Sequence, residues 1–393
     1  MTEIRIFGEH DDRTREQMAR CMQYGSVAGG VLCADGHLGY AQPVGGVIAY
    51  EEHVSVSGVG FDIGCGNMAV RLDVPKRRIE DRVGPILAEI AATVSFGVGR
   101  TNAEKVEHDL FDHPLWRESE VAGPLRQMAR DQLGTVGSGN HYVDLFEDED
   151  GLVWIGVHFG SRGLGHRTAT AFIKLAGGAD GIDVAPTILQ QDSDLGRQYL
   201  AAMELAGLYA YAGREWVVER VRRIVGGEIL DTVHNHHNYA WRERHGERDL
   251  WVVRKGATPA FPGQRGFVGG SMGDDAVILR GVESDAAAAS FYSTVHGAGR
   301  VMSRTEARGR FRKDPETGKK VRLPGRVRHD EMQAWLRAKG VHLVGGDLDE
   351  APQAYRRLPD VLAHHAGTVE IEQTLKPFAV VMAGADVFDP FKD

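Results

Sequence analysis

Cysteine is scarce in this chain of 393 residues, which has only three, at positions 21, 33 and 65. Three cysteines cannot form a full disulfide framework and none stands in a Cys-x-x-Cys pair, so we expect reduced thiols. No apolar run approaches the ~20 residues of a membrane span, and the N-terminus lacks the basic and apolar stretches of a secretory signal. These absences predict a cytoplasmic protein with no membrane partner.

Net positive charge is also absent, because the chain carries −9 at pH 7 and has a pI near 6.0. This balance argues against a generic nucleic-acid coat protein but leaves room for a local basic tract. Glycine, by contrast, is abundant: the 50 glycines are about twice the usual ~7% share. They cluster around histidines rather than in a linker, which favours active sites built from loops.

Hydrophobic periodicity gives a coarse secondary structure. Helical patterns cover 12–24, 77–94, 165–176, 194–225 and 329–338, and strand patterns cover 44–50, 68–74, 141–146, 152–158, 250–254, 367–375 and 378–383. Because strands and helices do not alternate regularly, the order predicts an α+β fold with mixed sheets rather than a doubly wound sheet. We find no repeat or interdomain linker, and the candidate ligands are spread along the chain, so we expect one complex catalytic domain over 1–393.

A metal site is indicated by the run Gly-Phe-Asp-Ile-Gly-Cys-Gly (60–66), where Asp62 and Cys65 stand three apart on a glycine-rich turn. Glycine-flanked histidines recur further on, in the runs 137–141, 158–163, 236–238 and 296–300. A carboxylate, a thiolate and several imidazoles suit zinc, manganese, iron or cobalt. A lone cysteine or histidine is more often structural, so the evidence for a metal site is that these runs occur together in one chain. The pattern points to a metal-dependent enzyme acting on phosphates.

A phosphate site is indicated around His296, which is followed by Gly297, Ala298, Gly299 and Arg300. The small residues leave room for a bulky ligand, and a guanidinium offers phosphate a planar donor fork. A histidine there could be a general acid or base, a nucleophile forming a phosphoramidate, or a structural residue in a glycine turn. Ser271, in a second glycine-rich loop at 269–273, could add a hydroxyl to such a phosphate cradle.

A basic segment follows directly, since 300–328 holds eleven Lys or Arg against three acids, a net +8 in an acidic protein. Charge runs are usually solvated faces. Next to a candidate catalytic histidine, this one is a candidate track for a phosphate backbone.

Taken together, these runs resemble the RtcB-type RNA-splicing ligase family over nearly the whole chain, from Asp35-Gly-His37 to Lys376-Pro377. The most specific are Gly-Phe-Asp-Ile-Gly-Cys-Gly, Gly-Ser-Gly-Asn-His, the His-x-Gly-Ser-Arg-Gly-Leu-Gly run from 158, His-His-Asn-Tyr, Arg-Lys-Gly-Ala and His-Gly-Ala-Gly-Arg. The resemblance implies an RtcB-like fold and an enzyme that joins RNA 3′-phosphate or 2′,3′-cyclic phosphate ends to 5′-hydroxyl ends. It also implies GTP and manganese as cofactors and leaves open an archease-type activator.

The resemblance assigns roles residue by residue. His296 would attack the GTP α-phosphate to form a histidine–GMP intermediate, Asn140 and Asn238 would help bind the nucleotide or metal-bound phosphates, and Tyr355 would lie near the guanine. Two metal ions would be held, with Cys65 bridging them, by Asp62, Cys65, His141, His158 and His237.

The sequence departs from the family pattern at nucleotide recognition and not at the metals. Met382 stands in place of a terminal lysine that contacts the nucleotide, and Asp144 replaces a glutamate that reads guanine. Asp274-Asp275-Ala276 replaces a small hydroxyl-bearing run, and its two carboxylates should weaken triphosphate binding unless they turn away or meet a cation. Lys392 could replace the missing lysine.

Two alternatives to the ligase remain. The altered nucleotide pocket motivates a metal-dependent phosphodiesterase or end-healing hydrolase that opens cyclic phosphates without GTP. A non-catalytic RNA-binding relative would use the basic segment alone, and it would require all five metal-ligand candidates to be vestigial.

Overall fold

The computed structural model describes residues 3–318, 320–385 and 387, and it has mixed sheets with helices packed against them. This confirms the predicted α+β class. The larger sheet follows the order β13-β14-β19-β6-β7-β5-β9, with β18 added on β19. Its strands are β13 (Arg265–Val268), β14 (Ala276–Gly281), β19 (Val369–Gly384), β6 (Tyr142–Glu147), β7 (Leu152–Phe159), β5 (Gly66–Pro75), β9 (Ile229–His236) and β18 (His342–Gly346).

This sheet curls toward a barrel, and side-chain hydrogen bonds connect its two outer strands, β9 and β13. Asn235 of β9 accepts a hydrogen bond from the Phe267 N–H of β13 at 3.0 Å. Asn67 of β5 donates to the Phe267 carbonyl at 2.8 Å. Two edges that would otherwise lie open are therefore linked.

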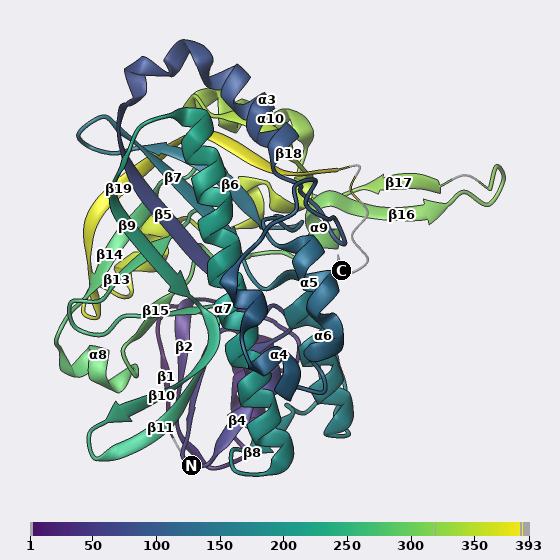
Figure 1. Ribbon diagram of the computed structural model, residues 1–393, viewed down its shortest axis with the longest axis vertical. Helices are drawn as coiled ribbons and strands as arrows, with labels where there is room; N and C mark the ends of the chain where they lie inside the picture. Colours follow the sequence, from purple (N-terminus) through teal and green to yellow (C-terminus); the bar gives the residue numbers. More distant parts are fainter. Residues whose placement is uncertain (1–2, 319, 386, 388–393) are drawn as a thin grey trace.

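A second sheet follows the order β1-β2-β3-β11-β10 and forms the lower half of the view in Figure 1. Its strands are β1 (Ile4–Ile6), β2 (Val27–His37), β3 (Val44–Tyr50), β11 (Arg248–Lys255) and β10 (Asn238–His245). Three two-stranded ladders complete the sheets: β4 (His53–Ser55) with β8 (Ile188–Gln190), β12 (Ala257–Pro259) with β15 (Ser293–Val295), and β16 (Gly309–Lys313) with β17 (Lys320–Pro324).

The longest helix, α7 (Asp194–Val225), runs along both halves of the molecule (Figure 1). The Ser193 hydroxyl caps its start by accepting a hydrogen bond from the Gly196 N–H, and Gly226 ends it. The other helices are α1 (Asp12–Cys21), α2 (Val56–Val59), α3 (Val83–Thr93), α4 (Leu115–Glu118), α5 (Arg126–Gln132), α6 (Arg162–Leu175), α8 (Asp285–Ala289), α9 (Arg304–Arg308), α10 (His329–Lys339) and α11 (Leu358–Ala363). None of the helices within these ranges is long and apolar enough to cross a membrane.

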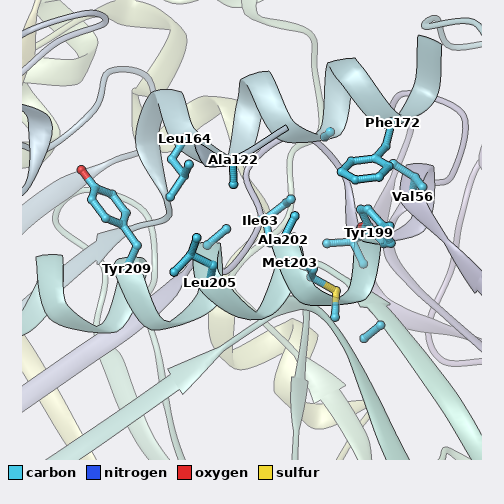
Figure 2. Close-up of a cluster of buried hydrophobic side chains, with 14 of the residues drawn as sticks. Val56, Ile63, Ala122, Leu164, Phe172, Tyr199, Ala202, Met203, Leu205 and Tyr209 are labelled. Atoms are coloured by element: carbon cyan, nitrogen blue, oxygen red, sulfur yellow. The ribbon is translucent and has the colours of Figure 1, made fainter. Parts of the chain in front are cut away.

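The core between α6 and α7 fixes the position of the glycine-rich turn at 60–66. Leu164 and Phe172 of α6 face Tyr199 and Leu205 of α7, and Ile63 of the turn is buried among them (Figure 2). Burying an isoleucine side chain contributes about 1.5–3 kcal/mol. The turn is therefore anchored by its apolar residue, while the neighbouring Asp62 and Cys65 face a cavity.

Candidate functional site

A cavity of about 1100 Å³ brings together the candidate metal ligands, the candidate catalytic histidine and the residues that the resemblance and the glycine-rich loops assign to nucleotide binding. These residues come from loops and strand ends of both sheets. Its lining includes Asp62, Cys65, Asn140, His141, His158, His237, Asn238, Ser271, His296, Gly297, Ala298, Gly299, Arg300 and Tyr355. The clustering was predicted, although the residues span almost 300 positions of sequence.

The turn that carries Asp62 and Cys65 depends on its glycines. Gly64 has φ +70°, a conformation that other residues adopt only with strain. A Cβ on Gly66 would lie 2.1 Å from the Asn235 carbonyl oxygen, so only glycine lets the start of β5 approach β9 this closely. The turn thus leads directly into β5, which lies between β7, the strand that carries His158, and β9, the strand that ends beside His237.

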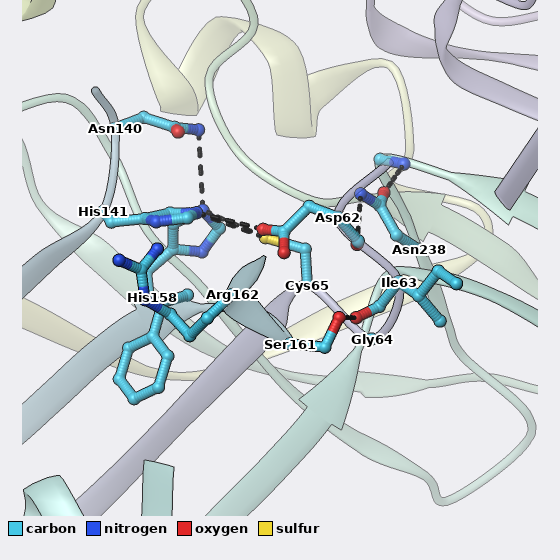
Figure 3. Close-up of polar contacts among 12 residues, drawn as sticks. Asp62, Ile63, Gly64, Cys65, Asn140, His141, His158, Ser161, Arg162 and Asn238 are labelled. Carbon is cyan, nitrogen blue, oxygen red and sulfur yellow. Dashed lines mark hydrogen bonds and ion pairs between the residues drawn. The ribbon is translucent and has the colours of Figure 1, made fainter. Parts of the chain in front are cut away.

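Two groups of candidate ligands share one thiol. Cys65 lies with His158 and His237 in one group and with Asp62 and His141 in the other, and the ligand atoms of each group are within 4.8 Å of one another. The Cys65 Sγ is 3.8 Å from His141 Nε2 and 3.7 Å from His158 Nε2 (Figure 3). The Asp62 Oδ2 is 3.1 Å from His141 Nε2.

Burial keeps two imidazoles of this cluster, those of His158 and His237, in the neutral form that binds metals. It lowers the pKa of His158 and His237 well below the usual value, and neighbouring histidines add to the effect. Burial and the Asp62 charge raise the pKa of the Cys65 thiol, so a metal ion would have to displace its proton. Burial alone would raise the pKa of Asp62, but the hydrogen bond and charge of His141 outweigh it and bring the pKa to about 2.

The donor set fits a divalent transition metal. Three imidazoles, one carboxylate and one thiol supply nitrogen, oxygen and sulfur ligands. His158 is further oriented by its Nδ1, which is 2.6 Å from the Asn67 Oδ1, as metal-binding histidines commonly are. Asn140 Nδ2 lies 3.5 Å from His158 Nε2, and Asn238 donates to the Asp62 carbonyl at 3.3 Å, so both amides adjoin the cluster.

His296 is held by a buried carboxylate that the sequence analysis did not single out. Asp35, at the end of the buried part of β2, is fully buried, and its Oδ2 lies 2.6 Å from His296 Nδ1. The same oxygen accepts hydrogen bonds from the backbone N–H of His296 at 3.0 Å and of Gly297 at 3.3 Å. Burial would raise the pKa of Asp35, but His296 outweighs it and lowers the pKa, so the carboxylate is ionised. His296 Nδ1–H therefore donates to Asp35, which leaves the Nε2 lone pair available.

His296 also lies beside the candidate metal ligands. The rings of His237 and His296 have centroids 5.0 Å apart. A nucleophile or base at His296 would therefore act next to any ion held by the Cys65 groups.

Arg300, which its sequence context predicts as a donor fork for phosphate, lines the cavity and is hydrogen-bonded to protein groups. Its Nη1 donates to the Tyr355 hydroxyl at 2.8 Å, its Nη2 to the Asp349 carbonyl at 2.7 Å and its Nε to the Met302 carbonyl at 3.2 Å. The Tyr355 hydroxyl in turn donates to Glu350. Arg300 and Tyr355 thus form one hydrogen-bonded wall of the cavity.

The carboxylates at 274 and 144 differ in their surroundings. Asp274 meets a cation, because its Oδ1 lies 2.6 Å from Arg357 Nη2 and its Oδ2 accepts from the Ser271 hydroxyl at 3.1 Å. Asp144 lines the cavity with Met382, and its buried Oδ1 has no hydrogen-bond partner among the described residues. Burial raises the pKa of Asp144 well above its usual value. Ala276 is buried in β14, and Lys392 lies outside the described residues.

The basic segment divides into two parts. In one part the cations are paired: Arg304, which lines the cavity, pairs with Asp349 and Glu350, Arg326 with Glu306, and Arg328 with Asp330. Beyond them, β16 and β17 form a hairpin that projects from the body (Figure 1). Arg310, Arg312 and Lys313 are exposed there and make no ion pair with any described residue. We call residues 309–324 the basic arm.

These features define a class of protein: a mixed α/β protein with a Cys/His/Asp cluster and a carboxylate-held histidine in one cavity. The chain matches the family described as tRNA-splicing ligase RtcB over residues 17–126 and 115–383. It therefore belongs to the RtcB family, which confirms the resemblance.

Individual proteins of this family are similar in sequence to this chain over most of their length. The RNA-splicing ligase RtcB of Escherichia coli (strain K12) is 30% identical over 381 residues, covering 88% of each chain. The tRNA-splicing ligase RtcB of Thermococcus kodakarensis is 29% identical over 452 residues, covering 94% of this chain and 91% of the relative. That of Nanoarchaeum equitans is 30% identical over 429 residues, covering 89% and 87%.

Proposed function

We propose that the protein is an RNA ligase that joins 3′-phosphate or 2′,3′-cyclic phosphate ends to 5′-hydroxyl ends, using GTP and manganese. Family membership supports RNA ligation. The observation that carries the proposal further is the Asp35–His296 pair beside the Cys65 cluster, since it combines a prepared nucleophile with metal ligands in one cavity.

Two manganese ions would be held by the two groups that share Cys65, namely Asp62, Cys65, His141, His158 and His237. Bound there, the ions would neutralise phosphate charge next to His296. The buried imidazoles of His158 and His237 and the shared thiol described above support this assignment.

The protein's own residues would carry the group transfer. His296 Nε2 attacks the α-phosphorus of GTP, a P–N bond forms, and pyrophosphate leaves. Asp35 stabilises the positive charge that develops on the ring, because its carboxylate already accepts the Nδ1 hydrogen bond. The guanylate then passes from nitrogen to the RNA 3′-phosphate as the P–N bond breaks, and the RNA 5′-hydroxyl displaces GMP. A cyclic phosphate first takes up water to open.

The remaining cavity residues would bind the nucleotide. Asn140 and Asn238 would contact phosphates near the metals, Tyr355 would lie near the base, and Ser271 with residues 297–300 would line the phosphates. The basic arm supports RNA as substrate, because its free cations lie in the same segment as the cavity wall. An archease-type activator stays a prediction.

A second function is favoured by one observation. The buried Oδ1 of Asp144 has no hydrogen-bond partner among the described residues, and Asp144 and Met382 line the same cavity, where the resemblance expects the guanine to be bound. If this pocket binds GTP poorly, the protein would instead act as a metal-dependent hydrolase that opens cyclic phosphates.

The test is an RNA with a cyclic phosphate at one end and a 5′-hydroxyl at the other, incubated with manganese, with and without GTP. We expect joined RNA only when GTP is present. Opening of the cyclic phosphate without GTP, and no joined product with it, would favour the hydrolase.

A further inference from the structure

Arg214 is a buried arginine that the proposed reaction does not use. It lies in the middle of α7 and is 0% exposed. Its Nη1 donates to the Gly64 carbonyl at 2.9 Å and to the Phe159 carbonyl at 2.7 Å. Its Nε donates to His234 Nε2 at 2.9 Å, and its Nη2 lies 3.0 Å from His236 Nδ1.

Three of these contacts fall next to candidate metal ligands in the sequence. Gly64 precedes Cys65, Phe159 follows His158, and His236 precedes His237. Those three ligands form one complete group, and they come from the turn at 60–66, from β7 and from the junction of β9 with β10. One planar guanidinium therefore touches all three segments that carry the group.

The charge of Arg214 is not explained by an ion pair. No carboxylate of the described residues lies within 4.0 Å of its guanidinium. Burial lowers its pKa to about 10, which still leaves it cationic at neutral pH, and Cys65 and Asp62 are among the groups that favour the charged form. Burying an unpaired charge is costly, and an apolar residue on this face of α7 would pack without that cost.

The guanidinium can donate several hydrogen bonds at once, which an apolar residue cannot do. It is a rigid fork of donors with fixed directions, so it can hold two carbonyls and two imidazoles in one geometry. Its positive charge also interacts favourably with Cys65 and Asp62 of the ligand cluster. Groups of this kind around a metal site orient the ligands and commonly tune affinity about 10- to 100-fold.

We propose that Arg214 is the positioning residue of the metal site, fixing Cys65, His158 and His237 relative to one another through the backbone and side chain of their sequence neighbours. This inference rests on the proposed metal centre. It goes beyond it by assigning the preorganisation of the centre to a residue that contacts no ion.

The test compares Arg214→Lys with Arg254→Lys as a matched control. Arg254 is also 0% exposed, but its guanidinium binds Glu243, the Ser293 hydroxyl and the Phe291 carbonyl. Lysine keeps the charge and loses the fork in both variants. Cobalt(II) is titrated into each protein, and the thiolate-to-cobalt absorption reports the Cys65 ligand.

We expect Arg214→Lys to bind cobalt about 10- to 100-fold more weakly than the wild type with a changed absorption band, and Arg254→Lys to stay within about threefold. Thermal unfolding of both variants checks that each is folded. Unchanged affinity and spectrum in a folded Arg214→Lys protein would overturn the proposal, as would an equal loss in Arg254→Lys.

A metal-free measurement separates this inference from the proposed centre. In the structure, the Cys65 N–H donates to the Asp62 carbonyl at 3.0 Å and the His237 N–H to the Cys65 carbonyl at 2.8 Å, and the exchange of both amides can be followed in metal-free protein. We expect faster hydrogen exchange of these amides in Arg214→Lys and not in Arg254→Lys. If wild-type protein bound no metal while this difference held, the metal centre would be wrong and the positioning right. No difference in exchange would contradict the positioning itself.

Discussion

Replacing Asp35 by asparagine isolates the electrostatic part of the proposed nucleophile. Asparagine keeps the shape of the side chain, and its carbonyl can still accept the hydrogen bonds from His296 and Gly297. What is lost is a buried negative charge 2.6 Å from a ring that becomes cationic when Nε2 attacks phosphorus.

The size of the effect follows from that geometry. A charge-assisted hydrogen bond is about twice as strong as a neutral one, and the ion pair formed on the reaction path is only partly screened inside the protein. A loss of about 2–4 kcal/mol of transition-state stabilisation corresponds to a rate about 30- to 1000-fold lower.

The assay is the rate at which intact mass rises by one GMP in a single turnover with GTP and manganese. Asp148→Asn is the control, because Asp148 is also buried but pairs with Arg71, away from the cavity. We expect the control to form the adduct at the wild-type rate. A folded Asp35→Asn protein that forms the adduct within threefold of that rate would refute the role of the carboxylate.

Three further predictions concern RNA, metal and pH. Replacing Arg310, Arg312 and Lys313 of the basic arm by alanine should weaken RNA binding and lower the slope of log K against log salt by about 2–3, since each phosphate contact contributes about 0.7–0.9, while leaving the GMP adduct unchanged. Cys65→Ser should lose both ions by metal analysis, because Cys65 belongs to both ligand groups, and chelated wild type should regain the adduct when manganese is restored. Burial lowers the pKa of His365 to about 4 in the folded protein. Between pH 6.5 and 4 this histidine is therefore protonated in the unfolded chain but neutral in the folded protein. The free energy of unfolding should therefore fall by about 3 kcal/mol more in wild type than in His365→Gln between pH 6.5 and 4, measured by urea titration.

Each of these predictions has a control and a contrary result. The exposed arginines at 77, 78 and 82 offer a triple alanine variant with the same loss of charge, which should not change RNA binding. Cys21→Ser replaces a buried thiol outside the ligand groups and should keep both ions. An equal salt slope in the two triple variants, metal retained by Cys65→Ser, or parallel pH curves for His365→Gln and wild type would each contradict the corresponding prediction.

The fold was predictable where periodicity is strong and local. The helix expected at 194–225 has those bounds in the structure, because its apolar positions recur over 32 residues between a serine cap and a glycine. The strands expected at 367–375 and 378–383 are wrong as two elements, since β19 runs through Val369–Gly384. The strand continues through Pro377 and has a shift of register between Pro377 and Ala379.

Other misses have equally specific causes. The helix expected over 77–94 begins only at Val83, after two short 3-10 turns that share its residue preferences. The basic arm was not predicted as a hairpin. Its many charged residues obscure the alternation of apolar and polar residues by which a strand is recognised in a sequence. The predicted single catalytic domain stays a prediction.

The candidate site was predictable as a set of residues but not as a network. Glycine-flanked histidines mark ligand positions locally, and the cavity brings all of them together. Asp35 lies 261 residues from His296, and no local spacing reports such a pair. Arg214 did leave a signal: it stands three and four positions from Val217 and Ala210, on the buried face of α7, where a charged residue is out of place.

The most direct test of the central claim is intact mass after incubation with manganese and GTP, with ATP in parallel and His296→Ala as the control. The account predicts a GMP adduct on wild type and none on His296→Ala, which should still bind metal. An AMP adduct would mean that the pocket around Asp144 and Met382 reads adenine instead of guanine. Metal-loaded wild type without any adduct, or an adduct that persists in His296→Ala, would contradict the account.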